Sequence, residues 1–266
     1  MIELGLKDRA VLITGGGTGI GAATARVMAA GGAHPVLLGL EADQEALEAV
    51  AAATGGVAVA GDAADPDCVR QAIARARERW GGIGTLVTCA GGSGQGAVMD
   101  MDDARWAAGI RNNLTTAFVA ARECLPDLIE RSGAIVVVSS RAGISGPPHL
   151  SGYITGKHAL IGLVRSLASD YGPSGVRVNA VCPGFVRTRM GDAVMDRLAA
   201  RDAISREQAY ELANRGAPLR RPAEPEDIAH LIMFLASDWA RALTGAVIPA
   251  DSGWSAVDAA ALELAR

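Results

Sequence analysis

The chain has 266 residues, 50% of them hydrophobic and only 4% aromatic, and its formal net charge is −4. This length and apolar content allow a large buried core, and they exclude a disordered chain or a small disulfide scaffold. Acidic and basic residues alternate without a block of lysine or arginine, so we expect no nucleic-acid partner.

The four cysteines are far apart with no Cys-x-x-Cys pair, and the four histidines lack metal-ligand spacing. We therefore predict no disulfide framework, no metal site and a reduced, cytoplasmic location. The amino-terminal residues carry charges before a short apolar run, unlike a secretory signal. No stretch reaches the roughly 18 uncharged apolar residues that span a bilayer, so we expect no membrane association.

The first predicted strand, Ala10 to Thr14, runs into a glycine-rich loop and an alanine-rich helix. Glycines let the backbone turn tightly and approach a pyrophosphate, whose charge then lies at the positive end of the helix. The order of strand, glycine loop and helix therefore predicts a dinucleotide site. Its candidate residues are Gly15, Gly17, Thr18, Gly19 and Ile20.

A second predicted strand, Pro35 to Gly39, is followed by Leu40 and Glu41, where the adenosine ribose would lie. A carboxylate there can accept hydrogen bonds from both ribose hydroxyls and would repel a 2′-phosphate, which favours NAD. Glu41 is equally interpreted as the first-turn acid of a helix from Asp43 to Ala53, stabilised by the helix dipole. The sequence leaves both interpretations open.

Two further strands end in residues suited to contact a ligand. Val57 to Ala60 forms the third strand and is followed by Asp62 and Ala63. Gly84 to Thr88 forms the fourth and runs into Cys89-Ala90-Gly91-Gly92, a turn that exposes its backbone. Such a turn can lie against an adenosine, although a plain turn would look the same.

From Asp102 the pattern predicts a long helix with one apolar stripe. The stripe consists of Trp106, Ile110, Leu114, Phe118, Ala121 and Leu125. Asn113 interrupts this helix, and because asparagine is a mediocre helix former we expect it either to face solvent or to be hydrogen-bonded within the protein. The fifth strand, Ala134 to Ser139, then places Ser140 at its carboxyl end.

Tyr153 and Lys157 stand four residues apart, so both project from one face of a helix that begins near Ser151 and runs to about Tyr171. A fixed positive charge beside a phenol favours the phenolate, which would make Tyr153 a proton donor and acceptor. The Tyr-x-x-x-Lys spacing alone is common and is more often structural. Its interpretation depends on the rest of the chain.

A sixth strand, Val176 to Val181, ends at Cys182-Pro183-Gly184. Residues 185–218 are helical in pattern but interrupt the alternation of strands and helices, and we predict a substrate lid there, although a surface excursion is the alternative. The seventh strand, Ala246 to Ala250, precedes residues 256–266, which are typical of a short tail helix or a subunit-contact arm.

Seven strands alternate with helices, and no linker rich in proline or serine interrupts them. This predicts an α/β fold with a single domain over residues 1–266. Its centre would be a Rossmann-type, doubly wound, seven-stranded parallel sheet with helices on both faces. Ligands bind along the carboxyl ends of the strands in such a fold.

With these positions identified, the chain resembles the short-chain dehydrogenase/reductase family over nearly its whole length. Each motif alone is weak, but the ordered set is specific. The motifs are Thr14-Gly15-x3-Gly19-Ile20-Gly21, Asp62, Ala90-Gly91, Asn113, Ser140, Tyr153-x3-Lys157, Asn179-Ala180-Val181-Cys182-Pro183-Gly184, and Asp251-Ser252-Gly253.

The resemblance implies reversible hydride transfer between NAD(P)(H) and the CH–OH or C=O group of a secondary alcohol or ketone. It implies that Tyr153 exchanges the proton with the substrate oxygen, and that Ser140 hydrogen-bonds this oxygen. Lys157 would hold the nicotinamide ribose and, with the oxidised ring, lower the pKa of the tyrosine. Asn113 would keep a water in a proton relay, which completes the predicted catalytic set.

The resemblance also extends the predicted cofactor contacts along the carboxyl edge of the sheet. These contacts are expected in addition to the glycine-loop residues given above. They are Leu40, Glu41, Asp62, Ala63, Cys89, Ala90, Gly91, Tyr153, Lys157, Pro183, Gly184, Val186 and Thr188.

The chain departs from the family pattern at three places. Cys89 replaces the usual asparagine, so a side-chain brace between neighbouring strands is lost or replaced. The residues after the second strand are neither the aspartate typical of NAD users nor the arginine typical of NADP users, and Thr18 is not basic, so we expect NAD. Gly156 replaces a common serine, which we expect to be tolerated.

The family resemblance further implies a homotetramer. An alternative function is a dinucleotide-sensing binding protein of the same fold without catalysis. Cys89 is the one feature that favours this alternative.

Overall fold

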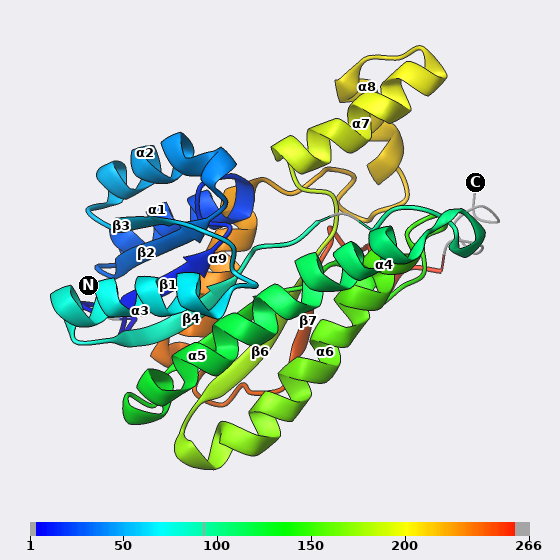
Figure 1. Ribbon diagram of the computed structural model, residues 1–266. Coiled ribbons are helices and arrows are strands. Elements are labelled where there is room, and N and C mark those ends of the chain that lie inside the picture. Colours follow the sequence, from blue (N-terminus) through cyan, green and yellow to red (C-terminus); the bar gives the residue numbers. More distant parts are fainter. Residues whose placement is uncertain (1–3, 93, 259–266) are drawn as a thin grey trace.

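The computed structural model describes residues 4–92 and 94–258. Seven parallel strands form one sheet in the order β3-β2-β1-β4-β5-β6-β7 (Figure 1). The strands are β1 (Ala10–Thr14), β2 (His34–Gly39), β3 (Val57–Ala60), β4 (Ile83–Thr88), β5 (Ala134–Val138), β6 (Arg177–Pro183) and β7 (Val247–Ala250). The strand order reverses between β1 and β4, and parallel sheets bind ligands at the carboxyl ends of strands beside such a reversal.

Helices cover both faces of the sheet, so the predicted fold class is confirmed. One face is covered by α1 (Gly19–Ala30), α2 (Gln44–Thr54) and α9 (Pro225–Ala236). The other is covered by α3 (Pro66–Trp80), α5 (Thr116–Glu130) and α6 (Ser151–Tyr171). Beyond the carboxyl edge lie α4 (Asp103–Ile110), α7 (Arg189–Asp202) and α8 (Arg206–Asn214).

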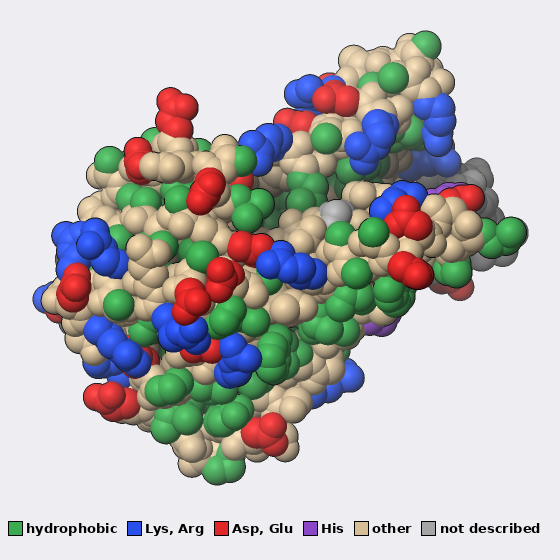
Figure 2. Space-filling view, viewed as in Figure 1, with side chains coloured by type: hydrophobic (Ala, Val, Ile, Leu, Met, Phe, Trp, Pro, Cys, Tyr) green, Lys and Arg blue, Asp and Glu red, His purple; other side chains and the backbone are tan. Residues whose placement is uncertain are grey.

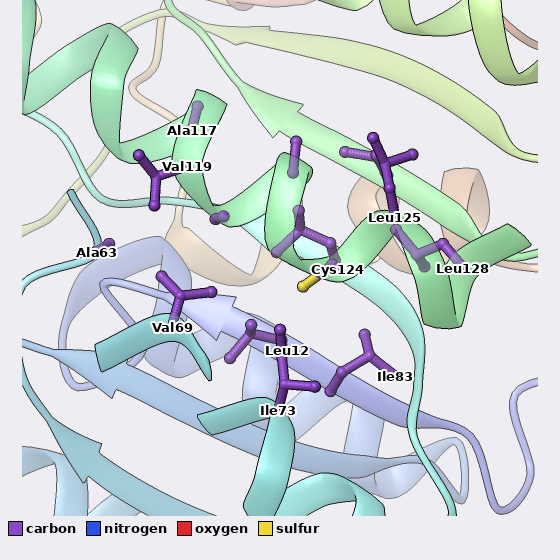
Figure 3. Close-up of a cluster of buried hydrophobic side chains, with 14 of the residues drawn as sticks. Leu12, Ala63, Val69, Ile73, Ile83, Ala117, Val119, Cys124, Leu125 and Leu128 are labelled. Carbon is purple, nitrogen blue, oxygen red and sulfur yellow. The ribbon is translucent and has the colours of Figure 1, made fainter. Parts of the chain in front are cut away.

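The core lies in two layers, one on each face of the sheet. Side chains alternate along a strand, so Leu12 of β1 points into one layer while Val11 and Ile13 point into the other. Figure 3 shows the first layer, where Leu12 faces side chains of α3 and α5 such as Ile73 and Cys124. Among the described residues, no helix is both long enough and apolar enough to cross a membrane.

The long helix predicted from Asp102 is interrupted. A π-helical turn over Arg111–Thr115 separates α4 from α5. Such a turn adds a residue to the helical repeat and rotates the face of the downstream helix relative to that of the upstream one. The expected single apolar stripe is therefore wrong in part, since Trp106 and Phe118 are 41% and 46% exposed.

A buried carboxylate ties α5 to α3 and to the start of β4. Asp127 lies on α5, and its Oδ1 atom accepts a hydrogen bond of 2.6 Å from the Arg77 guanidinium of α3. Its Oδ2 atom accepts a bond of 2.9 Å from the backbone N–H of Ile83. Removing a buried partner leaves the remaining charge and donor unsatisfied.

We predict that Asp127→Ala lowers the free energy of unfolding by about 2–3 kcal/mol, measured by urea denaturation. The matched control is Asp196→Ala, which breaks the solvent-exposed pair of Asp196 with Arg206. Exposed ion pairs contribute little, so the control should unfold at nearly the parental urea concentration. Equal effects of the two substitutions would contradict this assignment.

Candidate active site

Strand β5 and helix α6 are joined by two buried hydrogen bonds at the carboxyl edge of the sheet. The Lys157 ammonium donates to the backbone carbonyl of Val138 at 3.0 Å. The Ser139 hydroxyl donates to the backbone carbonyl of Lys157 at 2.9 Å. These bonds fix the register of α6 against β5, and they bring Tyr153 and Lys157 to the edge where Ser140 emerges.

Close backbone packing fixes the amino end of α6. The Ser151 hydroxyl donates to the carbonyl of Gly96 at 2.8 Å, and the Tyr153 N–H donates to the carbonyl of Gly94 at 3.0 Å. A Cβ atom at Gly94 would lie 2.6 Å from the Tyr153 nitrogen, so only glycine permits this approach. The predicted helix start at Ser151 and end at Tyr171 agree with the structure.

Ser140 and Tyr153 meet at the mouth of the site. The Ser140 Oγ atom accepts a hydrogen bond of 3.1 Å from the Ala142 N–H, which leaves its own proton available for donation. Burial raises the pKa of Tyr153, and a side-chain hydrogen bond with Ser140 offsets part of that rise. Without a ligand, the phenol is therefore protonated at neutral pH.

Lys157 lies deep in the same site, with its Nζ atom 5.7 Å from the centroid of the Tyr153 ring. Burial lowers the pKa of Lys157 to about 8, and interactions with Cys89 and Cys182 act in the opposite direction. The sequence spacing predicts that the lysine favours the tyrosinate. In the protein alone, burial raises the pKa of Tyr153 above its ordinary value, and the opposing influence comes from Ser140.

Asn113 is fully buried and hydrogen-bonded within the protein, one of the two alternatives expected from the sequence. It lies in the π-helical turn, and its amide nitrogen donates to the carbonyls of Gly92 and Gly109 at 2.7 and 2.9 Å. Its Oδ1 atom accepts from the Gly92 N–H at 3.0 Å. The side chain therefore fixes the turn after β4 to the α4–α5 junction.

Glycine at position 156 is explained by this arrangement. A Cβ atom there would lie 2.8 Å from the Cβ atom of Asn113. A Cβ atom at Gly91 would lie 3.1 Å from both the Asn113 Oδ1 and the Lys157 Nζ atoms. Small residues thus let Asn113 and Lys157 approach the turn after β4.

The glycine loop forms an open cradle between β1 and α1. Gly15 has a φ of +67°, and Gly19 has a φ of +51°. A Cβ atom at Gly21 would lie only 2.2 Å from the Gly15 carbonyl oxygen. Thr18 is the N-cap of α1, and no side chain caps the helix there. Exposed N–H groups at a helix start bind pyrophosphate well, so these residues fit a dinucleotide.

The remaining loop residues pack around this cradle. A Cβ atom at Gly17 would lie 3.1 Å from Leu47 of α2, and Ile20 packs against the core layer under α1. At the end of β2, Leu40 and Glu41 are exposed, and Glu41 begins a short 3-10 turn that precedes α2. This location keeps the Glu41 carboxylate accessible to a ligand.

Asp62 and Ala63 follow β3 but differ in orientation. The Asp62 carboxylate accepts hydrogen bonds from the Ala64 N–H at 2.8 Å and from the Arg111 guanidinium at 2.5 Å. The side chain of Ala63 is buried in the core layer of Figure 3, so only its backbone can face a ligand.

The brace expected to be lost at Cys89 is replaced by Thr14. The Thr14 hydroxyl accepts a hydrogen bond of 3.2 Å from the Ala90 N–H, and the Thr14 carbonyl accepts one of 3.1 Å from the Cys89 N–H. Burial raises the pKa of the Cys89 thiol to about 12, with Lys157 acting against the rise. Cys89 is therefore an uncharged packing residue between the lysine and the sheet.

The segment after β6 returns to the glycine loop. Pro183 ends β6, and Gly184 packs so closely on the residues after β7 that a Cβ atom would lie 2.9 Å from the Asp251 Cα atom. Val186 is buried, and Thr188 is the N-cap of α7. A Cβ atom at Gly19 would lie 3.1 Å from Thr188 Cγ2, so these two predicted cofactor contacts, 169 residues apart in sequence, lie side by side.

Helices α7 and α8 form a small body with its own core beyond the sheet edge (Figure 1). Met195 and Tyr210 are fully buried within it, and the Tyr210 hydroxyl donates to Asp192 at 2.9 Å. The Met195 side chain therefore packs inside this body and does not face the sheet edge. Met190, in the first turn of α7, instead lies near Gly92, where a Cβ atom would be 3.2 Å from its Cε atom.

An ion pair crosses from α7 to the turn after β2. The Arg189 guanidinium lies 3.0 Å from the Asp43 carboxylate, which joins residues 146 positions apart. Of the predicted tail, 256–266, the structure describes only residues 256–258, and the remainder lies outside the described residues.

Three polar residues of the site, Thr14, Ser139 and Arg111, were assigned no role in the site from the sequence, where Thr14 appears only as the last residue of the first strand and the first residue of the glycine motif. Thr14 directly precedes Gly15, and Ser139 directly precedes Ser140, and both of these following residues were predicted to belong to the site. Their hydroxyls could have been recognised as polar groups at the ends of buried strands, where an internal hydrogen bond is required. Nothing in the sequence indicated that Arg111 would pair with Asp62.

The whole chain matches known proteins. A family model described as enoyl-(acyl carrier protein) reductase matches residues 15–255. Protein MoaE of Klebsiella aerogenes is 42% identical over 97% of this chain and 99% of its own length. The 2-(S)-hydroxypropyl-CoM dehydrogenase 3 of Xanthobacter autotrophicus is 38% identical over 95% of this chain and 98% of its own length.

Solved structures also match this chain over nearly its whole length. The L-sorbose reductase of Gluconobacter frateurii, complexed with NADPH and L-sorbose, superimposes with a TM-score of 0.89 at 27% identity, covering 97% of this chain and 100% of that one. The chain belongs to the short-chain dehydrogenase/reductase family, which confirms the resemblance. It is an NAD(P)-dependent oxidoreductase that interconverts alcohols and ketones.

We predict that Lys157→Met makes the ligand-free protein more stable at pH 7, by about 2 kcal/mol, because it removes a charge that burial destabilises. Below pH 8 the lysine is charged in both the folded and the unfolded state, so the folded protein carries the whole penalty. Between pH 8 and the ordinary value of 10.5, the folded protein loses the proton first, and the penalty fades as pH rises.

Urea denaturation of both proteins from pH 6 to pH 11 measures this difference. The stability gain of Lys157→Met should be largest below pH 8 and should shrink as pH rises. A gain that is independent of pH, or a variant less stable at every pH, would contradict the burial penalty.

Proposed function

We propose that Tyr153 is the general acid and base of this oxidoreductase. Ser140 hydrogen-bonds the same substrate oxygen through the proton that its contact with Ala142 leaves available. Lys157 holds the nicotinamide ribose. The observation that carries the proposal is the pair of buried bonds between β5 and α6, since they bring all three side chains to one edge of the sheet. When bound, the nicotinamide dinucleotide supplies or accepts the hydride.

The proton that Tyr153 gives or takes must reach solvent. We assign that route to Lys157 and a water kept by Asn113 in the π-helical turn. The Asn113 Oδ1 and Lys157 Nζ atoms would each lie 3.1 Å from a Cβ atom placed at Gly91, so the two polar groups are near enough to each other for one water to bridge them. Chains of hydrogen bonds of this kind also strengthen one another in a buried environment.

We predict that Tyr153→Phe lowers kcat by about a thousandfold or more, because the phenyl ring has no proton to exchange with the substrate oxygen. NADH binding, measured by fluorescence titration, should stay close to the parental value. Tyr171→Phe, at the far end of α6, is the matched control and should keep full activity. Unchanged turnover in Tyr153→Phe would exclude the role, and turnover of any alcohol by the parent would exclude the dinucleotide-sensing alternative.

The proposed cofactor is NAD. Glu41 is exposed directly after β2, where its carboxylate can accept hydrogen bonds from both adenosine ribose hydroxyls and would repel a 2′-phosphate. Thr18, beside it in the proposed site, is uncharged. The L-sorbose reductase structure contains NADPH, so this choice varies within the fold and needs its own test.

We predict that the parent binds NAD more tightly than NADP, and that Glu41→Ala narrows the ratio of the two dissociation constants by about tenfold. Glu45→Ala is the control, because Glu45 is an acidic residue in the first turn of α2 that interacts with the helix dipole and not with the ribose. This substitution should leave the ratio of the two dissociation constants unchanged. Calorimetric titration with both dinucleotides measures the ratio. A parental preference for NADP would refute the assignment.

Residues 185–218 are the proposed substrate lid. The first turn of α7 supports this role, since Met190 lies near Gly92 and Arg189 pairs with Asp43 across the cleft. The internal core of α7 and α8 would let them move as one body. Closure of such a body excludes water from the reacting groups.

We further propose that the protein is a homotetramer in a reduced, cytoplasmic environment. Figure 2 shows hydrophobic side chains gathered over α5 and α6, and Phe118 and Trp106 are exposed beside them. All four cysteines are free. Light scattering should give four times the mass of the chain, and Phe118→Glu should reduce it by placing a charge in the contact. A monomeric parent protein would contradict the assembly.

A further inference from the structure

A cationic side chain lies beside the catalytic serine and takes no part in the reaction described above. Arg141 follows Ser140 directly, at the carboxyl end of β5. Its guanidinium carbon lies 5.6 Å from the ring centroid of Phe185, which follows β6, and 5.0 Å from that of Trp254, which follows β7. Three neighbouring strand ends thus meet around one arginine.

This guanidinium has no hydrogen-bond acceptor within the described part of the chain. Burial lowers the pKa of Arg141, and the charge of Asp251 opposes the change. Arginine nevertheless remains charged in proteins, and because Arg141 is only partly buried, its N–H donors are left to solvent or to a ligand. No hydrogen bond or ion pair joins Arg141 to Asp251 in the described residues, and the Asp251 oxygens instead accept hydrogen bonds from Gly253 and Ser255.

A second unsatisfied donor belongs to the same group of residues. The indole nitrogen of Trp254 is buried and has no hydrogen-bond partner. Its ring packs closely against Gly216, where a Cβ atom would lie 2.6 Å from Cη2. Buried donors without acceptors are rare in folded proteins, and each is a reason to expect a ligand or a water.

We propose that Arg141 and the Trp254 indole N–H bind a carboxylate carried by the alcohol or ketone substrate. The substrates would then be hydroxy acids and the corresponding oxo acids, held with the reacting carbon toward Ser140 and Tyr153. This assignment rests on the proposed function of Tyr153 and names the substrate class for that site.

The aromatic contacts favour a carboxylate over an uncharged group. A guanidinium that lies over ring faces is restrained in orientation, and its donors remain in the plane of the group. Two parallel N–H donors in that plane match the two oxygens of a carboxylate. Phe185 begins the proposed lid, so binding at Arg141 would also be sensitive to lid closure.

The test compares oxo acids with their methyl esters as substrates, with the ketone separated from the carboxyl carbon by zero to four carbons. For at least one spacing, the parental kcat/KM should favour the acid by about tenfold or more, as expected for a charge-assisted hydrogen bond. Arg141→Gln should bring the ratio of acid to ester close to one. Trp254→Phe keeps an aromatic ring, removes the N–H and should lower the ratio by a smaller factor.

Arg75→Gln is the matched control, because it removes the same charge from an exposed position of α3. It should keep the parental ratio of acid to ester. Arg141→Lys retains the charge without the planar fork and should give an intermediate ratio. Thermal melting of each variant identifies any variant that fails to fold. If Arg141→Gln does not fold, the comparison is made with Arg141→Lys instead.

Two outcomes would overturn the inference. If the parent protein has equal kcat/KM for acid and ester at every spacing, the site does not bind an anion. If Arg141→Gln lowers kcat/KM equally for acid and ester, Arg141 only positions the aromatic rings. Failure of the proposed function is distinct, since no ketone would then be reduced. In that case calorimetric titration with the same acids tests the carboxylate site by itself. The parent protein must still bind the acid, and Arg141→Gln must not.

Discussion

The site depends on a double hydrogen bond between β5 and a single residue of α6. Ser139 and Val138 at the end of β5 bind the backbone carbonyl and the ammonium of Lys157. One bond fixes the height of the helix along the strand, and the other holds the lysine head group under the sheet edge. Tyr153 lies one helical turn before Lys157, so its position against Ser140 is set by that register. Loss of either bond would therefore displace Tyr153 and Lys157 together, relative to Ser140.

The same constraint buries a positive charge, and no carboxylate among the described residues balances it. Lys157 lies among Cys89, Cys182 and backbone carbonyls, and its pKa falls to about 8. Burial simultaneously raises the pKa of Tyr153. The ligand-free site is thus unfavourable for a lysine ammonium and for a tyrosinate. Ribose oxygens would accept hydrogen bonds from the ammonium, and the positive charge of an oxidised nicotinamide would favour the tyrosinate. Under the proposed function, the catalytic state of the site would form on dinucleotide binding, at a cost to the stability of the free protein.

Much of this arrangement is encoded in local sequence, and the remainder in long-range contacts. Strands such as β1 and β3 were predicted with their observed bounds because apolar runs between turn residues specify buried strands. Helix α6 was predicted equally well. The π-helical turn was not, because the bond of Asn113 to Gly92, 21 positions away in the sequence, forms only in the folded protein and leaves no local pattern. The partners of Arg141, which lie 44 and 113 positions downstream, leave no local pattern at all.

The most direct test is the ionisation of the Tyr153 phenol with and without bound dinucleotide. Ultraviolet difference titration of the parent against Tyr153→Phe isolates this one tyrosine. We expect a pKa above the ordinary value of 10.0 in the protein alone, because burial dominates, and a clearly lower pKa once NAD is bound. A phenol that already ionises below 10.0 in the free protein, or one whose pKa does not move on NAD binding, would contradict the proposed role of the site.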